Sequence, residues 1–166
     1  MDARKWNSKK VVGNLVEKNS GDIQNENVKL KVETVLNPSE DPEKVKKCLL
    51  NIANGCKPIL SDGHIEATCT GILSLHHIRV GVRSKSTLGV LRKLLEWNRK
   101  GNLTWFLLNK QAAYEDVISL VENFEESPLG PIRVTIISDN LDRIIEWLLS
   151  SRDRDRDREQ TSFLTF

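Results

Sequence analysis

Strict alternation of apolar and charged residues near position 30 constrains the fold of this chain most strongly. The segment begins with six residues in which every second one is apolar: Val28, Lys29, Leu30, Lys31, Val32 and Glu33. Successive side chains of a strand point to opposite faces, so this period of two indicates a half-buried β-strand. The same alternation returns at 103–107 and 132–136, which we also predict to be strands.

Helix signals lie between these strands. Asp41 offers a capping oxygen, Pro42 suits the first helical position, and Glu43 follows in the first turn. The next apolar residues share one helical stripe: Val45, Cys48, Leu49 and Ile52. We expect this helix to end at Asn54-Gly55.

Two later segments also have helical spacing. Ser86 is the expected cap of the first, whose buried side is predicted to carry Leu88, Leu91, Leu94, Leu95 and Trp97. Asp139 is the expected cap of the last helix, whose inward residues are predicted to be Leu141, Ile144, Ile145 and Leu148. Both helices follow from apolar residues recurring every three or four positions.

The remaining segments complete an α+β pattern. Asp62-Gly63 lies between two apolar segments and predicts a hairpin, and 117–121 is expected to be another strand. Residues 75–83 fit a strand and a helix equally well. Because helices and strands mix through hairpin-length links without regular βαβ units, we predict an α+β fold with a mostly antiparallel sheet.

Length and composition indicate one globular domain with two tails. Of 166 residues, 39% are hydrophobic and 29% charged, which excludes disordered and fibrous classes. We expect an N-terminal extension at 1–27, poorly ordered because its apolar face is small, a domain at 28–150, and a mixed-charge tail at 151–166. No segment has the apolar length of a membrane span or a secretory signal, so we expect a cytoplasmic protein with three reduced cysteines.

Charge is segregated although the formal net charge is only +2. Residues 79–110 contain eight basic residues and one acid, whereas residues 114–126 contain five acids and no base. The two blocks could form a basic face beside an acidic face, or they could neutralise each other in the fold.

Catalytic and metal-binding patterns are weak. The candidate zinc ligands Cys48, Cys56, His64 and Cys69 lack the closely spaced cysteine pair that zinc sites use. Ser84 and Arg79 stand where a phosphate-binding loop needs glycine. We therefore expect neither a metal, nor a cofactor, nor an enzyme.

The basic block is the remaining functional signal. Lysines and arginines grouped on a helix and its ends suit phosphate contacts, since each neutralised phosphate releases condensed counterions. Because aromatic residues make up only 5% of the chain, we expect recognition of a duplex by its backbone or shape rather than base stacking on single strands.

Three segments are more specific than their composition: 32–45, 108–114, and 128–132 with the later Ile145 to Leu148. In this order they closely resemble the uncharacterised archaeal protein family 0201, over about residues 28–150. The resemblance implies predicted RNA binding, a homodimer, a helix at 74–83, and helices packed on an antiparallel sheet. It also implies a fold likened to the double-stranded-RNA-binding domain and to a ribosomal protein of the large subunit.

Within this family pattern, the Asn109-Lys110-Gln111 corner is the best site candidate, although Asn109 and Gln111 could equally cap a turn. Glu115-Asp116 departs from the glycine and arginine usual after the tyrosine at this position. We therefore expect a non-catalytic module for structured RNA or, alternatively, a dimeric structural or interaction protein. The candidate nucleic-acid contacts are Arg83, Lys85, Arg92, Lys93, Arg99, Lys100, Asn109, Lys110 and Gln111.

Overall fold

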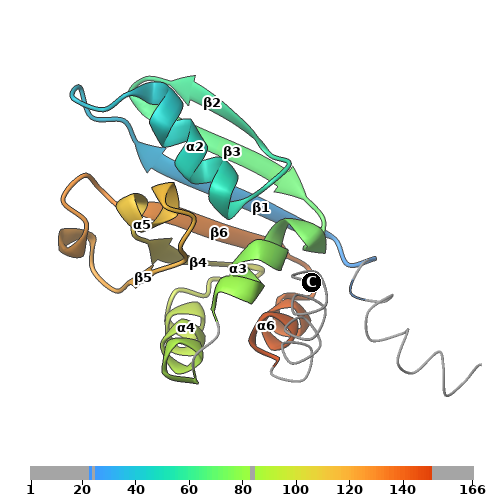
Figure 1. Cartoon of the computed structure of the whole chain (residues 1–166). Coiled ribbons are helices and arrows are strands. Elements are labelled where there is room, and N and C mark those ends of the chain that lie inside the picture. The colour runs from blue at the N-terminus through green and yellow to red at the C-terminus, as the bar shows by residue number, and fades with distance from the viewer. Residues whose placement is uncertain (1–22, 24, 83–84, 151–166) are drawn as a thin grey trace, which may run out of the picture.

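A computed structural model describes residue 23 and residues 25–82 and 85–150. Strands and helices intersperse along the chain (Figure 1). The first half contains β1 (Val28–Val35), α2 (Pro42–Ile52), β2 (Lys57–Ser61), β3 (His64–Thr70), the 3-10 turn η1 (Ile72–Leu75) and α3 (His76–Gly81). The second half contains α4 (Lys85–Trp97), β4 (Leu103–Leu108), α5 (Lys110–Tyr114), β5 (Leu120–Val121), the 3-10 turn η2 (Phe124–Glu126), β6 (Ile132–Ser138) and α6 (Leu141–Leu149).

The strands form one six-stranded sheet in the order β2-β3-β1-β6-β4-β5. Every neighbouring pair is antiparallel, so the predicted α+β class and the mostly antiparallel sheet are confirmed. The centre of the sheet pairs β1, near the start of the domain, with β6, near its end.

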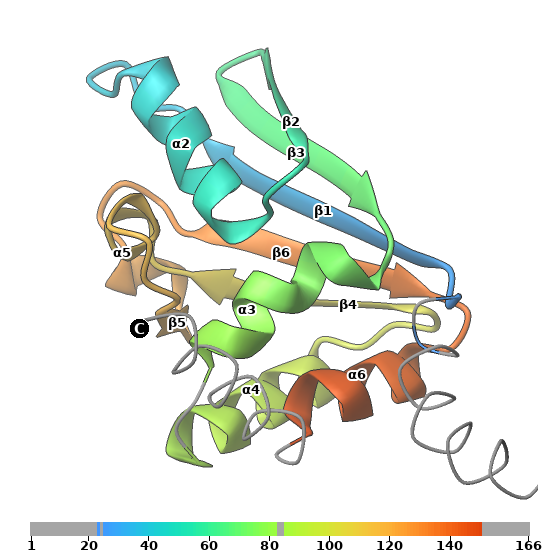
Figure 2. The same ribbon diagram turned by 45° about the vertical axis from the view of Figure 1, so that its right-hand side comes forward.

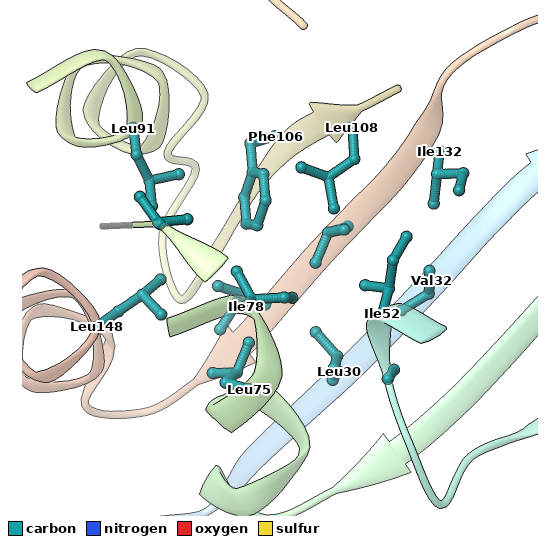
Figure 3. Close-up of a cluster of buried hydrophobic side chains, with 14 of the residues drawn as sticks. Leu30, Val32, Ile52, Leu75, Ile78, Leu91, Phe106, Leu108, Ile132 and Leu148 are labelled. Carbon is teal, nitrogen blue, oxygen red and sulfur yellow. The ribbon is translucent and has the colours of Figure 1, made fainter. Parts of the chain in front are cut away.

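The helices cover one face of this sheet (Figures 1 and 2). Alternate β1 residues, from Val28 to Thr34, point into the core beneath them, and their neighbours from Lys29 to Val35 point to the helix-free face. Figure 3 shows Leu30 and Val32 of β1 among side chains from α2, α3, α4 and α6. Burying this apolar area is the main stabilising contribution to the fold.

Local signals explain most boundaries. The Asp41 carboxylate accepts a hydrogen bond from the Glu43 backbone N–H at 3.0 Å, and α2 begins at Pro42 as predicted. Asp62 and Gly63 both have positive φ, at 50° and 71°, which is the backbone that a two-residue hairpin turn requires. The ambiguous 75–83 segment forms η1 and α3, so the helical alternative is correct through Gly81.

Some local predictions were wrong. Helix α4 begins at Lys85, so Ser86 lies within the helix instead of capping it. The cap of α6 is Asn140, one residue after Asp139. Trp97 is 71% exposed, because α4 buries Leu91, Leu94 and Leu95 along a stripe that leaves this indole outside. The strand predicted at 117–121 is formed only by Leu120 and Val121.

The cysteine prediction also needs correction. Cys56 and Cys69 form a disulfide, with their Cα atoms 5.1 Å apart, and Cys48 is a buried free thiol. The β2–β3 register explains the pairing, because Lys57 lies opposite Thr68 and the residues just beyond them face each other. The two cysteines are 13 residues apart in the sequence, and only the β2–β3 pairing brings them into contact, so their spacing alone did not predict the disulfide.

Parts of the expected tails lie outside the described residues. Ile23 nevertheless packs into the core, and the Glu26 carboxylate accepts a hydrogen bond from Arg143 at 3.2 Å, so both contact the domain. Within the described ranges, none of the helices combines the length and the apolar character needed to cross a bilayer.

Candidate functional site

The basic block does not form one continuous surface. Arg79 and Lys110 turn inward and are nearly inaccessible to solvent. The Arg79 guanidinium lies 4.8 Å from the Trp147 ring centroid, and its Nε donates to the Trp147 carbonyl at 3.0 Å. These two cations therefore stabilise packing instead of contributing to an exposed site.

Lys110 is the clearest departure from the sequence-based site. Its side chain was expected at an exposed corner, but the residue is only 2% exposed. The ammonium donates to the carbonyls of Val35 and Leu129, both at 2.8 Å, and to Glu40 Oε1 at 3.1 Å. Three acceptor groups satisfy its donors, so the ammonium is already engaged within the fold and is not presented for a phosphate.

The two residues that flank Lys110 have different roles: Asn109 caps helix α5, and Gln111 is exposed. Asn109 accepts a hydrogen bond from the Ala112 backbone N–H at 2.8 Å and thereby caps α5, as one of the two sequence-based alternatives allowed. Gln111 is exposed and borders a groove of about 500 Å³ between α2 and α5. Glu40 and Lys110 also line this groove, and Tyr114 forms part of its wall.

The surroundings of Glu40 lower the pKa of its carboxyl group. Burial alone would raise the pKa of its carboxyl group, but hydrogen bonds from Asn37 and Lys110 outweigh this effect and lower the pKa below its ordinary value. Asn37 donates to the Glu40 carboxylate through its side-chain amide at 2.6 Å and through its backbone N–H at 3.0 Å. The carboxylate therefore stays charged beside Lys110 at neutral pH.

Helix α4 and the turn that follows it carry the exposed part of the basic block. Arg92, Lys93, Arg99 and Lys100 are all exposed there. Arg92 lies 3.2 Å from the carboxylate of Glu146 on α6, and Arg99 pairs with Asp142 on the same helix. The Lys93 ammonium lies 4.4 Å from the Trp97 ring centroid.

The acidic partners of α4 thus come from α6, not from the acidic block at 114–126. Within that block, Asp116 lies 2.9 Å from His77 instead. Arg83 falls outside the described residues, and the side chain of Lys85 is likewise not described. The structure therefore leaves Arg92, Lys93, Arg99 and Lys100 exposed on α4 and the turn after it, and it encloses Lys110.

A second basic surface was missed by the sequence-based site. Lys29, Lys31 and Arg133 point to the helix-free face of the sheet, together with Lys57 of the edge strand β2. The Arg133 guanidinium lies 4.3 Å from the Trp105 ring centroid on this face. The period-two alternation already placed Lys29 and Lys31 on one side of β1, but the other strands become their neighbours only through the register.

An ion-pair cluster adjoins this surface. Glu33, His64 and Glu66 place one potential ligand atom each within 4.8 Å of one another, an arrangement compatible with a metal ion. The Lys31 ammonium already lies 3.1 Å from Glu33 and 3.5 Å from Glu66. Burial opposes ionisation of Glu33, but Lys31 and His64 outweigh it and lower its pKa, so the cluster is explained as a salt-bridge network.

Comparison with known proteins assigns the chain to a family. A search of protein-family models finds no match. A UPF0201 protein of Sulfurisphaera tokodaii is 35% identical over 130 residues, covering 72% of this chain and 86% of its own length. Another, from Methanothermobacter thermautotrophicus, is 32% identical over 120 residues and covers 72% of this chain and 89% of its own.

Solved structures agree with this relationship. The crystal structure of a UPF0201 protein from Methanococcus jannaschii has a TM-score of 0.60 and 29% identity, covering 73% of this chain and 92% of that one. A crystal structure of an uncharacterised UPF0201 protein has a TM-score of 0.61 and 26% identity; the match covers 71% of this chain and 90% of that one. The order of segments, the fold and these identities lead to one conclusion: this chain belongs to the UPF0201 family.

Proposed function

We propose that this protein is a non-catalytic binding module for structured RNA and that it contacts RNA through the exposed side of α4. The observation that carries the proposal is the exposure of Arg92, Lys93, Arg99 and Lys100 on one helix and the turn that follows it. Four exposed cations on a helix and the turn after it match the phosphate-dominated recognition of an RNA duplex.

In this proposal, Lys93 and Lys100 make the main contacts to RNA phosphates. Across the described residues, neither ammonium has a carboxylate within 4.0 Å. Arg92 and Arg99 pair with acids of α6, but exposed ion pairs contribute little to stability and can exchange for a phosphate. Lys110 has no part in this surface because its ammonium is enclosed.

Fluorescence anisotropy with a labelled hairpin RNA tests the proposal. Wild-type affinity should fall by orders of magnitude between about 50 and 200 mM salt if several phosphates are neutralised. The double variant Lys93→Gln/Lys100→Gln should bind more weakly and show a shallower salt dependence. The matched control Lys44→Gln/Lys47→Gln removes the same charge from exposed positions on α2 and should bind like wild type. Equal affinity of both double variants would exclude α4 as the contact.

A dimeric interaction protein is the second candidate, and the edge of the sheet favours it. Ile59, 63% exposed, and Leu60 lie on β2, whose outer side carries unpaired backbone groups. Such an edge can pair with a second strand. Light scattering that shows a dimer insensitive to salt, together with no RNA binding at 50 mM salt, would favour this candidate.

A further inference from the structure

We infer that the helix-free face of the sheet binds single-stranded RNA. The inference deepens the proposed function and rests on it, because it assigns a second ligand form and a second surface to an RNA-binding module. We call this surface the sheet patch and define it by seven residues: Lys29, Lys31, Lys57, Thr68, Thr70, Trp105 and Arg133.

The strand register places four residues of the sheet patch in one row across five strands, and it places Lys29, Thr70 and Arg133 in the rows on either side. Lys57 lies opposite Thr68, which lies opposite Lys31. The row continues through Thr135 to Trp105. Four strand spacings give it a length of about 19 Å. Because directly paired residues of antiparallel strands share a face, these side chains lie in one line perpendicular to the strands, within which Thr135 is buried between its longer neighbours.

The charge of the sheet patch is positive. Lys29 and Lys57 are exposed, and neither has a carboxylate within 4.0 Å among the described residues. The two acids of this face, Glu33 and Glu66, lie opposite each other in the next row and are already paired with Lys31. A polyanion on this face would therefore find Lys29 and Lys57 without a carboxylate partner among the described residues, and it would share Lys31 with Glu33 and Glu66.

Trp105 and Arg133 give the row a preference for nucleic acid over other polyanions. The Arg133 guanidinium, in the neighbouring row, lies 4.3 Å from the centroid of the Trp105 indole that ends the row, a cation–π contact. Unstacked RNA bases stack on both aromatic rings and guanidinium planes. The hydroxyl groups of Thr68 and Thr70 are exposed beside Lys29 and Lys31 and can donate to or accept from phosphate and 2′-hydroxyl groups.

The geometry favours a single strand on this face, in contrast to the duplex recognition that the low aromatic content led us to expect. A duplex hides its base planes, whereas stacking groups on a sheet need bases that can splay out, as on the four-stranded sheets of RNA-binding domains whose aromatic residues stack bases. Helix α4 lies on the opposite side of the sheet (Figure 2), so the two surfaces can be disabled independently.

The test compares a labelled ten-nucleotide uridine RNA with the hairpin RNA in anisotropy titrations at several salt concentrations. Each neutralised phosphate of a single strand contributes about 0.7 to the slope of log affinity against log salt, so Lys29→Gln/Lys57→Gln should reduce that slope by about 1.4. The same variant should leave hairpin binding unchanged. Trp105→Leu should weaken single-strand binding on the order of tenfold through lost stacking. Lys44→Gln/Lys47→Gln is the matched control and should behave like wild type.

Several outcomes would overturn the inference. Wild-type protein that binds the hairpin but not the single strand would refute the sheet patch and leave the proposed function intact. An unchanged slope for Lys29→Gln/Lys57→Gln would do the same, and circular dichroism of each variant verifies that it is folded. A change in oligomeric state by light scattering without a change in RNA affinity would identify this face as a contact between copies. Absence of binding to either RNA would instead refute the proposed function itself.

Discussion

The ammonium of Lys110 lies 3.1 Å from the carboxylate of Glu40, and both side chains are largely enclosed. The pair joins segments 70 residues apart in the chain, and the same ammonium also bonds the carbonyls that end β1 and precede Gly130. The corner at 109–111 is therefore a junction between α5 and the loop before α2. Its chemistry is that of a buried ion pair with satisfied hydrogen bonds.

Removing one member of this pair should destabilise the protein strongly. Lys110→Met leaves the Glu40 carboxylate without its cation; breaking a fully buried pair costs about 3–5 kcal/mol in the free energy of unfolding, and because Glu40 borders the groove and keeps its hydrogen bonds from Asn37, we expect a loss at or below the lower end of that range. Urea denaturation measures the difference. The double variant Glu40→Leu/Lys110→Met should recover part of the loss, because it leaves no uncompensated charge. Full additivity of the two single losses would contradict coupling between these residues.

Glu40 also predicts the direction of the acid response. Its folded pKa is held below the ordinary value of 4.5, so its stabilising contribution is complete above about pH 4.5 and is lost as the pH falls toward the folded pKa. Glu33 acts in the same direction. Unfolding free energies measured between pH 3 and 7 should decline more steeply at low pH for wild type than for Glu40→Gln. Parallel curves would mean that Glu40 does not carry this dependence.

Two helical glycines should respond in opposite ways to alanine. A Cβ at Gly81 would lie 2.7 Å from the Ile118 Cβ, which forces the backbone or the isoleucine to move. Gly81→Ala should therefore reduce thermal stability, with an overpacking penalty of about 1–3 kcal/mol. Gly89 on α4 has open space at the same position, so Gly89→Ala should stabilise the protein by about 0.5–1 kcal/mol. Equal effects of the two substitutions would contradict the close approach at Gly81.

The disulfide predicts the thiol chemistry of the purified protein. Unfolded protein without reductant should expose one reactive thiol, that of Cys48, and reduced protein should expose three. The bond closes a 13-residue segment, and loops of this size stabilise the folded state by about 3 kcal/mol. Cys56→Ser/Cys69→Ser should therefore melt at a lower temperature than wild type without reductant. Three thiols in the unreduced protein would show that the bond does not form.

The α4–α6 ion pairs predict an effect on RNA affinity. Glu146→Gln frees Arg92 from its carboxylate partner, whose oxygen lies 3.2 Å away, and removes a negative charge beside α4. Because this pair is exposed, stability should change little. Hairpin affinity should rise, and anisotropy measures it. The control Glu43→Gln removes an exposed acid from α2 and should leave affinity unchanged; a rise in both variants would reflect net charge alone.

Local sequence determined the elements and their class. Alternation at Val28–Glu33 predicted β1, and the Asp41-Pro42 start predicted α2, because backbone geometry and capping act over a few residues. The Asp62-Gly63 turn likewise produced the β2–β3 hairpin. These features depend on short-range sterics and hydrogen bonds, which the sequence records directly.

Tertiary structure decided which charges remained on the surface. Lys110 belongs to a residue type that is usually exposed, yet a carboxylate from position 40 and two backbone carbonyls enclose it. Trp97 belongs to a residue type that is usually buried, yet it is 71% exposed and none of the helices in the described ranges covers it. Lys31, Lys57 and Trp105 became one row only when five strands paired in a single register. Whether a side chain is buried, and which side chains surround it, depends on contacts between residues far apart in the sequence. The local pattern therefore determined the helices and strands, and only the packed fold determined the sites.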